Sequence, residues 1–257
     1  MTTTTKTTSN PALSALIAQK AGHTTEPRAP RTITTRALTG APRPPHLLIA
    51  GGDKVGKSYA LATAAADKRV ARVTVLEVGG DAGALDGYAH VAGPALELAE
   101  HNGTWADITA LLGELVDRPA PAGKGHDILA IDGVTSLWAV LSREALAGAR
   151  DIGAGGWAQV NAQWSDMLRL LRQHHGPVVL TARVDTSDMQ ADLLGRVRTQ
   201  KDLAYECDAT IQATAYRQFS LVSARSGHLA TLTPEALPAP IGELSIPDVL
   251  DLLGGIA

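Results

Sequence analysis

Short apolar runs alternate with amphipathic segments along most of the chain from residue 47 onward. Runs that are apolar or β-branched throughout are typical of strands that lie buried in a sheet. These runs predict strands over residues 47–50, 70–78, 127–131, 178–181, 209–216 and 219–224.

The intervals between the predicted strands carry apolar residues at helical spacing. The clearest interval is 157–173, where apolar side chains recur on one face until Gly176 and Pro177 stop the helix. The glycine-rich segment 153–156 predicts a non-helical break between two helices. Because strands and helices alternate, we expect an α/β fold with a mostly parallel central sheet flanked by helices. Helices are predicted over residues 57–67, 95–98, 105–116, 134–149 and 157–173.

Residues 1–45 differ from the rest, since they are rich in threonine and proline and carry six basic residues against one acid. This composition predicts a mostly disordered basic tail ahead of one domain spanning residues 46–257. Asn10 as a cap and Pro11 at the first position allow a short helix over residues 11–21. Such a helix would pack on its own domain or dock on a neighbouring subunit.

The composition narrows the classes of function. A net charge of -3 gives no global basic excess, so contact with a polyanion must come from local patches or from assembly. A single cysteine, Cys207, excludes an intrachain disulfide and a cysteine-rich zinc site, and favours a reducing, cytoplasmic setting. The N-terminus lacks a long apolar run, so we expect neither a signal peptide nor a membrane span.

Residues 51–58 read Gly-Gly-Asp-Lys-Val-Gly-Lys-Ser, a phosphate-binding loop between a predicted strand and a predicted helix. Its glycines let backbone N–H groups converge on phosphate oxygens, and the helix points its positive end at the same anions. Lys57 is expected to reach the β- and γ-phosphates of ATP, and the Ser58 hydroxyl to ligate Mg²⁺. The expected nucleotide-binding residues are Gly51, Gly52, Asp53, Lys54, Val55, Gly56, Lys57, Ser58 and Tyr59, with Thr181 and Arg183 from a later strand.

A second metal ligand is expected at the tip of another strand. The run His-Asp-Ile-Leu-Ala-Ile-Asp ends at Asp132 and has the pattern of a Walker B strand. Asp132 is therefore expected to hold Mg²⁺ through water beside the phosphate loop.

Hydrolysis also needs a group that orients or deprotonates the attacking water. Glu77 and Asp81 follow the strand at 70–78, and catalytic groups gather at the carboxyl ends of strands in such sheets. Either acid is a candidate base. Thr181 and Arg183 leave the strand at 178–181, where they would sense the γ-phosphate, or Arg183 would pair with a structural acid.

The order of these motifs resembles the core of RecA-type recombinases over residues 46–230. It looks like the short phage-encoded RecA-like ATPases described as recombinases or single-strand annealing proteins. The resemblance rests on Val-Thr-Val-Leu-Glu-Val-Gly-Gly-Asp with the Ala-Leu-Asp-Gly-Tyr-Ala that follows it, on Ile-Asp-Gly-Val-Thr-Ser-Leu-Trp, and on Leu-Val-Ser-Ala-Arg-Ser-Gly.

The resemblance implies roles for single residues. Asp81 lies nearest the family's catalytic glutamate, with Glu77 as the alternative. Arg183 departs from the family pattern, because it stands where a glutamine links ATP to DNA. Arg225 matches the basic residue that reaches into the neighbouring subunit's ATP site, and its alternative is an exposed arginine at a strand end. A ring or filament of subunits is implied. The expected catalytic residues are Lys57, Glu77, Asp81, Asp132 and Arg225.

Two segments fall where the family has its DNA-binding loops. The first, 148–156, contains Arg150, and the second, 184–199, contains Arg196 and Arg198 and is followed by Lys201. Flexible loops with spaced cations suit a single-stranded backbone, which proteins follow by charge. The alternative is two solvated surface loops.

These observations favour an ATP-dependent protein that acts on single-stranded DNA in recombination or annealing, in the cytoplasm of a host if it is phage-encoded. Replication or recombination proteins of the phage or host are then candidate partners, and a membrane is not. The alternative is a nucleotide-gated assembly or loader ATPase without a direct DNA role. A small-molecule kinase would need a lid with several arginines, and the sequence shows no such cluster.

Overall fold

The computed structural model describes residues 43–79, 83–185, 196–197, 199–200, 202–225 and 237–254. The helix predicted over residues 11–21, and all of the predicted basic tail except residues 43–45, lie outside the described residues. Within them, no helix is both long and apolar enough to cross a bilayer.

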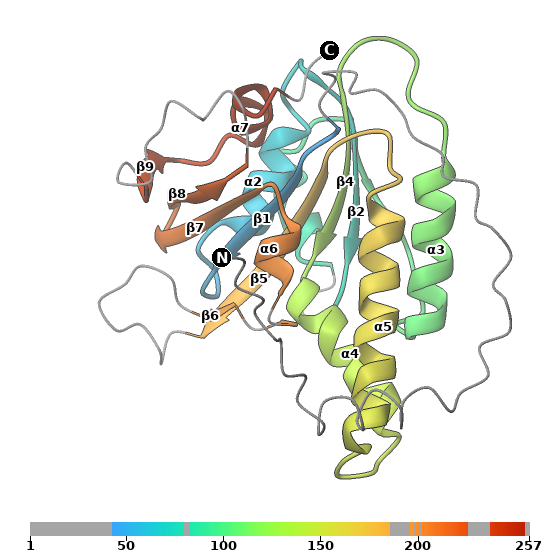
Figure 1. The fold of residues 1–257 in the computed structure, drawn as a ribbon. Coiled ribbons are helices and arrows are strands. Elements are labelled where there is room, and N and C mark those ends of the chain that lie inside the picture. Colours follow the sequence, from blue (N-terminus) through green and yellow to red (C-terminus); the bar gives the residue numbers. More distant parts are fainter. Residues whose placement is uncertain are drawn as a thin grey trace, which may run out of the picture. The chain divides into compact units, whose positions relative to one another are not determined.

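A nine-stranded sheet forms the centre of the described domain (Figure 1). Its strands run in the order β3-β2-β4-β5-β1-β7-β8-β9, and β6 pairs with β5 outside this path. Pairing is parallel from β3 to β7, while β7, β8 and β9 are antiparallel. The strands are β1 (His46–Gly51), β2 (Val70–Glu77), β3 (Leu96–Leu98), β4 (His126–Asp132), β5 (Val178–Asp185), β6 (Arg196–Val197), β7 (Ala209–Ala215), β8 (Gln218–Ala224) and β9 (Ala239–Gly242).

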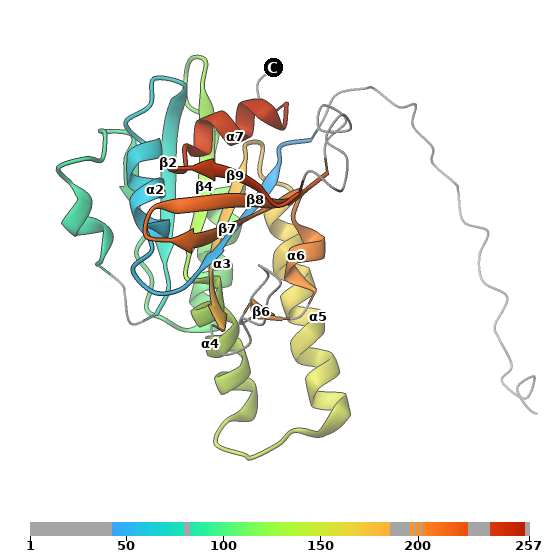
Figure 2. The same cartoon turned by 90° about the vertical axis from the view of Figure 1, so that its left-hand side faces the viewer.

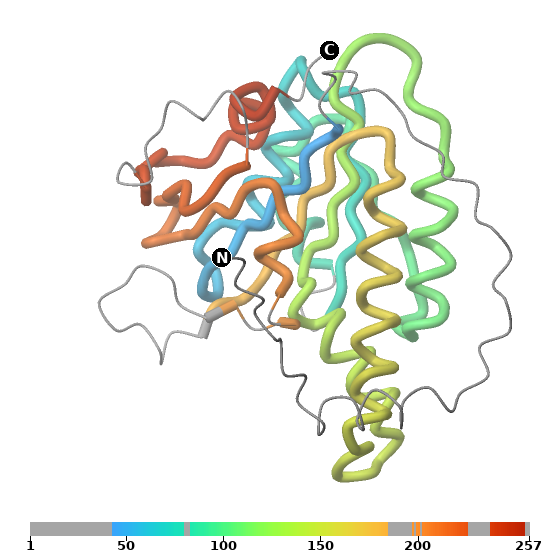
Figure 3. Tube along the Cα trace, viewed as in Figure 1, coloured from blue at the N-terminus to red at the C-terminus, as the bar shows by residue number. Residues whose placement is uncertain are grey.

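Helices cover both faces of the sheet (Figures 1 and 3). One face carries α3 (Trp105–Asp117), α4 (Val134–Leu146) and α5 (Gly153–Leu171). The other carries α2 (Lys57–Ala64) and α7 (Ile246–Leu252). Two short elements, η1 (Leu85–Tyr88) and α6 (Leu203–Glu206), complete the domain. This confirms the predicted α/β fold, a mostly parallel sheet flanked by helices.

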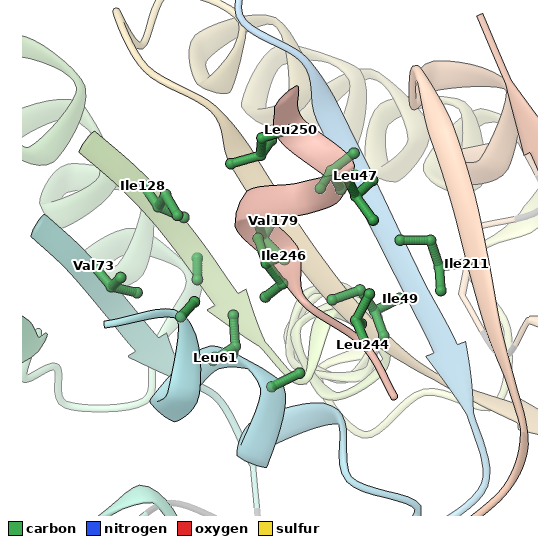
Figure 4. Close-up of a cluster of buried hydrophobic side chains, with 14 of the residues drawn as sticks. Leu47, Ile49, Leu61, Val73, Ile128, Val179, Ile211, Leu244, Ile246 and Leu250 are labelled. Carbon is green, nitrogen blue, oxygen red and sulfur yellow. The ribbon is translucent and has the colours of Figure 1, made fainter. Parts of the chain in front are cut away.

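The alternation of side chains along β1 divides the core into two layers. Leu47 and Ile49 join the apolar cluster under α2 and α7, whereas Leu48 joins the cluster under α3, α4 and α5. Figure 4 shows Ile246 and Leu250 of α7 packed toward β1 and β5. A strand buried on both faces must be apolar throughout, which is why this stretch of sequence lacks a polar alternation.

Two predictions of local structure are wrong. The helix predicted over 95–98 is the edge strand β3, which pairs with β2 in parallel. So short an apolar run has no readable period, and the free edge of β2 decides its conformation. The break predicted over 153–156 is the first turn of α5. Asp151 accepts hydrogen bonds there from the backbone of Ile152 (2.8 Å) and Gly153 (3.1 Å), which offsets the low helix propensity of glycine.

Candidate nucleotide-binding site

The phosphate loop joins β1, which ends at Gly51, to α2, which begins at Lys57. The Lys57 ammonium donates hydrogen bonds to the carbonyl oxygens of Gly51 (3.2 Å) and Gly52 (2.5 Å). The lysine is therefore held over its own loop, beside the first N–H groups of α2. This is the position from which it can meet an anion bound at the helix N-terminus.

A cleft of about 300 Å³ opens at the carboxyl ends of the parallel strands, above the phosphate loop. Since β5 lies between β1 and β4, the exits of these strands converge on the loop. The cleft is lined by Asp53, Lys54, Gly56, Lys57, Ser58, Glu77, Val78, Ala84, Tyr88, Asp132, Gly133, Ser136, Thr181, Ala182 and Arg183.

Asp132 is oriented by the neighbouring strand. The hydroxyl of Thr181, its partner in the β4–β5 register, donates a hydrogen bond to the Asp132 carboxylate and accepts one from the backbone of Gly133 (2.9 Å). Gly133 has a φ of 99°, and a Cβ there would lie 2.4 Å from the carbonyl oxygen of Val78. Only glycine fits this turn, so the Asp-Gly pair at the end of β4 sets the direction of the carboxylate.

The oxygen atoms of the cleft suit a magnesium ion. Ser58 offers a hydroxyl and Asp132 a carboxylate, both in the wall of the same cleft. Hard oxygen donors of this kind are the ligands that Mg²⁺ takes, usually beside substrate phosphates and water. The donor set therefore fits the metal that accompanies a nucleoside triphosphate.

Glu77 lines the cleft and also organises the chain that follows β2. Its carboxylate accepts hydrogen bonds from the backbone N–H groups of Gly83 (2.7 Å) and Leu85 (3.0 Å). The imidazole Nε2 of His101 contacts the Glu77 carbonyl oxygen at 2.8 Å. Glu77 thus closes the loop that contains Asp81, while Asp81 itself lies outside the described residues.

Arg183 lies near the carboxyl end of β5, at the mouth of the cleft. Its Nε lies 3.3 Å from the carboxylate of Asp53 in the phosphate loop. Its backbone N–H donates to the hydroxyl of Thr135 at the start of α4 (2.9 Å). Arg183 therefore does pair with an acid, but this acid belongs to the phosphate loop itself.

Comparison with known families adds to this geometry. The profile of a family described as an AAA domain matches residues 43–238, most of the chain. This protein belongs to that AAA-domain family. It carries a P-loop ATPase domain, which implies that it binds a nucleotide.

Among curated proteins, no relative of this AAA domain matches. Solved structures similar to it include a type III secretion ATPase of pathogenic bacteria, with 14% identity over 79% of this chain and a TM-score of 0.48. The RadB recombinase has 16% identity over 71% of this chain and 82% of its own, with a TM-score of 0.44. EscN, solved with its stalk EscO from enteropathogenic E. coli, has 15% identity over 66% of this chain and 42% of its own, with a TM-score of 0.45. The chain spans 58% of the secretion ATPase's length.

Arg225 lies on the edge of the AAA domain opposite the cleft. It follows β8, and its backbone N–H donates to the carbonyl oxygen of Asp208 (2.6 Å). Asp208 in turn bonds to His46 at the amino end of β1, and the Arg225 guanidinium donates to the carbonyl oxygen of Tyr205. The structure therefore separates Arg225 from the cleft of its own subunit.

The expected DNA-binding residues are described only in part. Arg150 is exposed in the connection between α4 and α5, two helices that run together beyond the edge of the sheet (Figures 1 and 2). Beside it, Asp151 precedes α5 and accepts a hydrogen bond from the Trp157 indole (3.0 Å). Arg196 forms a backbone pair with β5. The side chain of Arg196, and all of Arg198 and Lys201, lie outside the described residues.

The described residues also hold one cluster with metal-ligand chemistry, formed by Asp127, His174 and His175 away from the cleft. Its carboxylate is already engaged. Both Asp127 oxygens accept hydrogen bonds from Arg72, at 2.8 Å and 2.5 Å, and His175 Nε2 lies 2.7 Å from one of them. Burial lowers the pKa of His174. Because Arg72 already neutralises the carboxylate, the cluster is suited to a structural ion pair.

Several residues that line the cleft were not predicted from the sequence. Tyr88 and Ala84 come from η1 and the residue before it, an element with no readable period. Ser136 comes from the first turn of α4, four residues after Asp132, where the Walker B strand leads into a helix. That offset was readable from the sequence, whereas the approach of Tyr88 depends on tertiary folding.

Proposed function

We propose that this protein is a magnesium-dependent ATPase that acts on single-stranded DNA in recombination or annealing, as an oligomer in the cytoplasm. One observation carries the ATPase part. Lys57, Ser58, Glu77, Asp132 and Arg183 come from four different strand exits and line a single cleft. Cation, hydroxyl and carboxylates meeting at a phosphate loop are the groups that phosphoryl transfer requires.

Each residue of the cleft has a distinct task in this proposal. Lys57 would leave its two carbonyl partners for the β- and γ-phosphates, and Ser58 and Asp132 would hold Mg²⁺, which would supply charge that neutralises the phosphates. Thr181 keeps the Asp132 carboxylate in place. Arg183 exchanges Asp53 for the γ-phosphate, because the phosphate carries the greater negative charge.

The water that attacks the γ-phosphate needs a carboxylate near it. Glu77 lines the cleft, but both of its oxygens accept backbone hydrogen bonds. Asp81 lies on the loop that these hydrogen bonds close. We therefore assign the base to Asp81 and a positioning role to Glu77, as a proposal that Asp81→Asn and Glu77→Gln variants would separate.

The DNA part rests on cations in two segments that resemble DNA-binding loops. Arg150 is exposed at the far end of the α4–α5 hairpin, and α4 begins two residues after Asp132. The second segment, with Arg196, Arg198 and Lys201, continues from β5, which carries Thr181 and Arg183. Both segments are thus continuous in sequence with elements that line the cleft. A change in the cleft on ATP binding would therefore be passed along α4 and β5 to the segments that bind DNA.

The deciding experiment measures ATP hydrolysis by the full chain with and without single-stranded DNA, for the wild type and Lys57→Ala. We expect stimulation of the wild type by DNA. Lys57→Ala should lose turnover by about a hundredfold or more, because the phosphates lose a charge-stabilising donor. Its thermal unfolding should match that of the wild type. If DNA does not stimulate hydrolysis and ATP does not promote DNA binding, the proposed role on single-stranded DNA is refuted.

A protein-directed loader is the second candidate, favoured by the charges around Arg150. Asp151 is its neighbour in the sequence, and Glu144, in the last turn of α4, accepts a hydrogen bond from the backbone N–H of Trp105 in α3 (2.9 Å). These acids offset the basic charge that DNA requires. A salt titration separates the two functions. The logarithm of the binding constant for a single strand falls linearly with the logarithm of the salt concentration, with a slope of about -0.7 for each phosphate contacted. Arg150→Ala should flatten this slope if the residue contacts DNA.

A further inference from the structure

The turn between β7 and β8 contacts the outer side of the phosphate loop. The backbone N–H of Arg217, in this turn, donates a hydrogen bond to the carbonyl oxygen of Val55 (2.9 Å). A Cβ on Gly51 would lie 2.7 Å from the Cβ of Ala213 in β7, and one on Gly56 would lie 3.2 Å from Cγ of Arg217. The loop is therefore fitted closely against this hairpin at both of its ends.

The Arg217 side chain extends this contact along α2. Its guanidinium carbon lies 4.0 Å from the ring centroid of Tyr59, the residue after the loop serine. The Tyr59 ring meets the edge of Tyr88 at 5.6 Å, and Tyr88 lines the cleft. On its other side the guanidinium pairs with Glu243, between β9 and α7. Arg217 thus connects the C-terminal elements, the phosphate loop and one wall of the cleft.

The backbone at position 217 would suit glycine better. Arg217 has a φ of 55°, in the left-handed region that side chains with a Cβ disfavour. In addition, its Nε is buried and has no hydrogen-bond partner among the described residues. Tight hairpin turns commonly place a residue at positive φ, but glycine or asparagine usually occupies that position, whereas here it is an arginine. Local strain kept beside a ligand site is a recurrent sign that the side chain serves the site.

We propose that Arg217 is a positioning residue for the nucleotide. It holds the loop from Val55 to Tyr59 in the conformation that receives the phosphates, by its backbone bond to the loop and its stacking on Tyr59. Arg217 is not among the residues that line the cleft, so the role we propose for it is positioning. This inference rests on the proposed ATPase function.

The test is the affinity of the full-length protein for ATP with Mg²⁺, by titration calorimetry, with KM, kcat and the thermal unfolding midpoint alongside. Arg217→Ala and Arg217→Gly both remove the guanidinium but keep the backbone N–H. Both should bind ATP about tenfold more weakly, the scale of a lost stacked and paired cation. KM should rise by the same factor while kcat changes less.

Arg217→Gly separates positioning from stability, because glycine adopts a φ of 55° without strain. Its unfolding midpoint should equal or exceed that of Arg217→Ala, with equally weak ATP binding. Arg118→Ala is the matched control, since Arg118 forms a similar exposed pair with Glu97 (2.6 Å) at the β3 edge. Wild-type affinity in both Arg217 variants, in a protein that binds ATP, would overturn the inference. Failure of the wild type to bind ATP would instead refute the proposed function.

Discussion

The pair of Thr181 and Asp132 shows how single residues prepare the cleft before any ligand arrives. The two residues face each other in the β4–β5 register, and Thr181 is buried, with 1% of its surface exposed. A buried hydroxyl that donates to a carboxylate and accepts from Gly133 has only one useful orientation. In the proposed mechanism this carboxylate would need no reorganisation on binding phosphate and metal, which is the condition for electrostatic catalysis.

Burial of His46 makes the stability of the protein depend on pH. His46 is 5% exposed, and burial, reinforced by the nearby charge of Arg172, lowers its pKa to about 4. Asp208 acts in the opposite direction, and Arg43 and His174 add to the lowering. The same histidine in the unfolded chain has a pKa near 6.5. Between pH 6.5 and about pH 4 the unfolded state therefore binds a proton that the folded state does not. As a result, the free energy of unfolding falls as the pH decreases through this range.

Urea unfolding should reveal this effect as a loss of about 2 kcal/mol between about pH 7.5 and about pH 5 from His46. The lowered pKa of His174 adds a contribution of the same sign. In His46→Gln the pH-dependent loss should shrink by the His46 share, whatever the absolute stability of the variant. His90→Gln, at an exposed histidine, should behave as the wild type. An unchanged pH dependence in His46→Gln would contradict the assignment.

At the scale of elements, long periodic segments were predictable and short ones were not. The helices α3 and α5 repeat their apolar pattern over several turns, so their positions followed from the sequence. The strand β3 has three residues and depends on the free edge of β2. The helix α7 was missed although Ser245 caps it and Pro247 stands at its start, two signals that the sequence does contain.

The same limit applies to the elements of the site. Lys57, Ser58 and Asp132 belong to local motifs, so their convergence could be expected from the strand exits alone. The contact of Arg217 with the phosphate loop joins residues far apart in the chain. It depends on a tertiary approach that no local pattern encodes.

The first turn of α5 depends on one side chain, and this can be tested. Asp151 accepts hydrogen bonds from Ile152, Gly153 and the Trp157 indole, which together lower the pKa of its carboxyl, the indole contributing most. In Asp151→Ala the glycine-rich turn at 153–156 should fray, because glycine has low helix propensity. Hydrogen exchange should quicken there and the Trp157 fluorescence should shift.

Two variants control this experiment. Asp151→Asn keeps an acceptor oxygen and should preserve part of the protection. Asp166→Ala removes an acid from the same helix, where it pairs with Arg169 (2.8 Å), and should leave the first turn unchanged. Equal exchange at 153–156 in Asp151→Ala and the wild type would show that packing against α4 alone holds the turn.

At the scale of the whole molecule, the position of Arg225 constrains how subunits would assemble. The cleft opens at the carboxyl ends of the strands, and Arg225 lies beside His46 at the opposite edge. If Arg225 serves an ATP site, that site belongs to another subunit, placed head to tail. Such heterologous contacts generate rings when they close and filaments when they do not.

Mixing two inactive variants tests this arrangement. Lys57→Ala and Arg225→Ala should each have low turnover alone. When subunits exchange at random in an equal mixture, about a quarter of the interfaces combine an intact Lys57 with an intact Arg225, and about that share of wild-type activity should return. Lys57→Ala mixed with the double variant Lys57→Ala/Arg225→Ala creates no intact site and should stay inactive. If the first mixture is only as active as the mean of its components, Arg225 does not act between subunits.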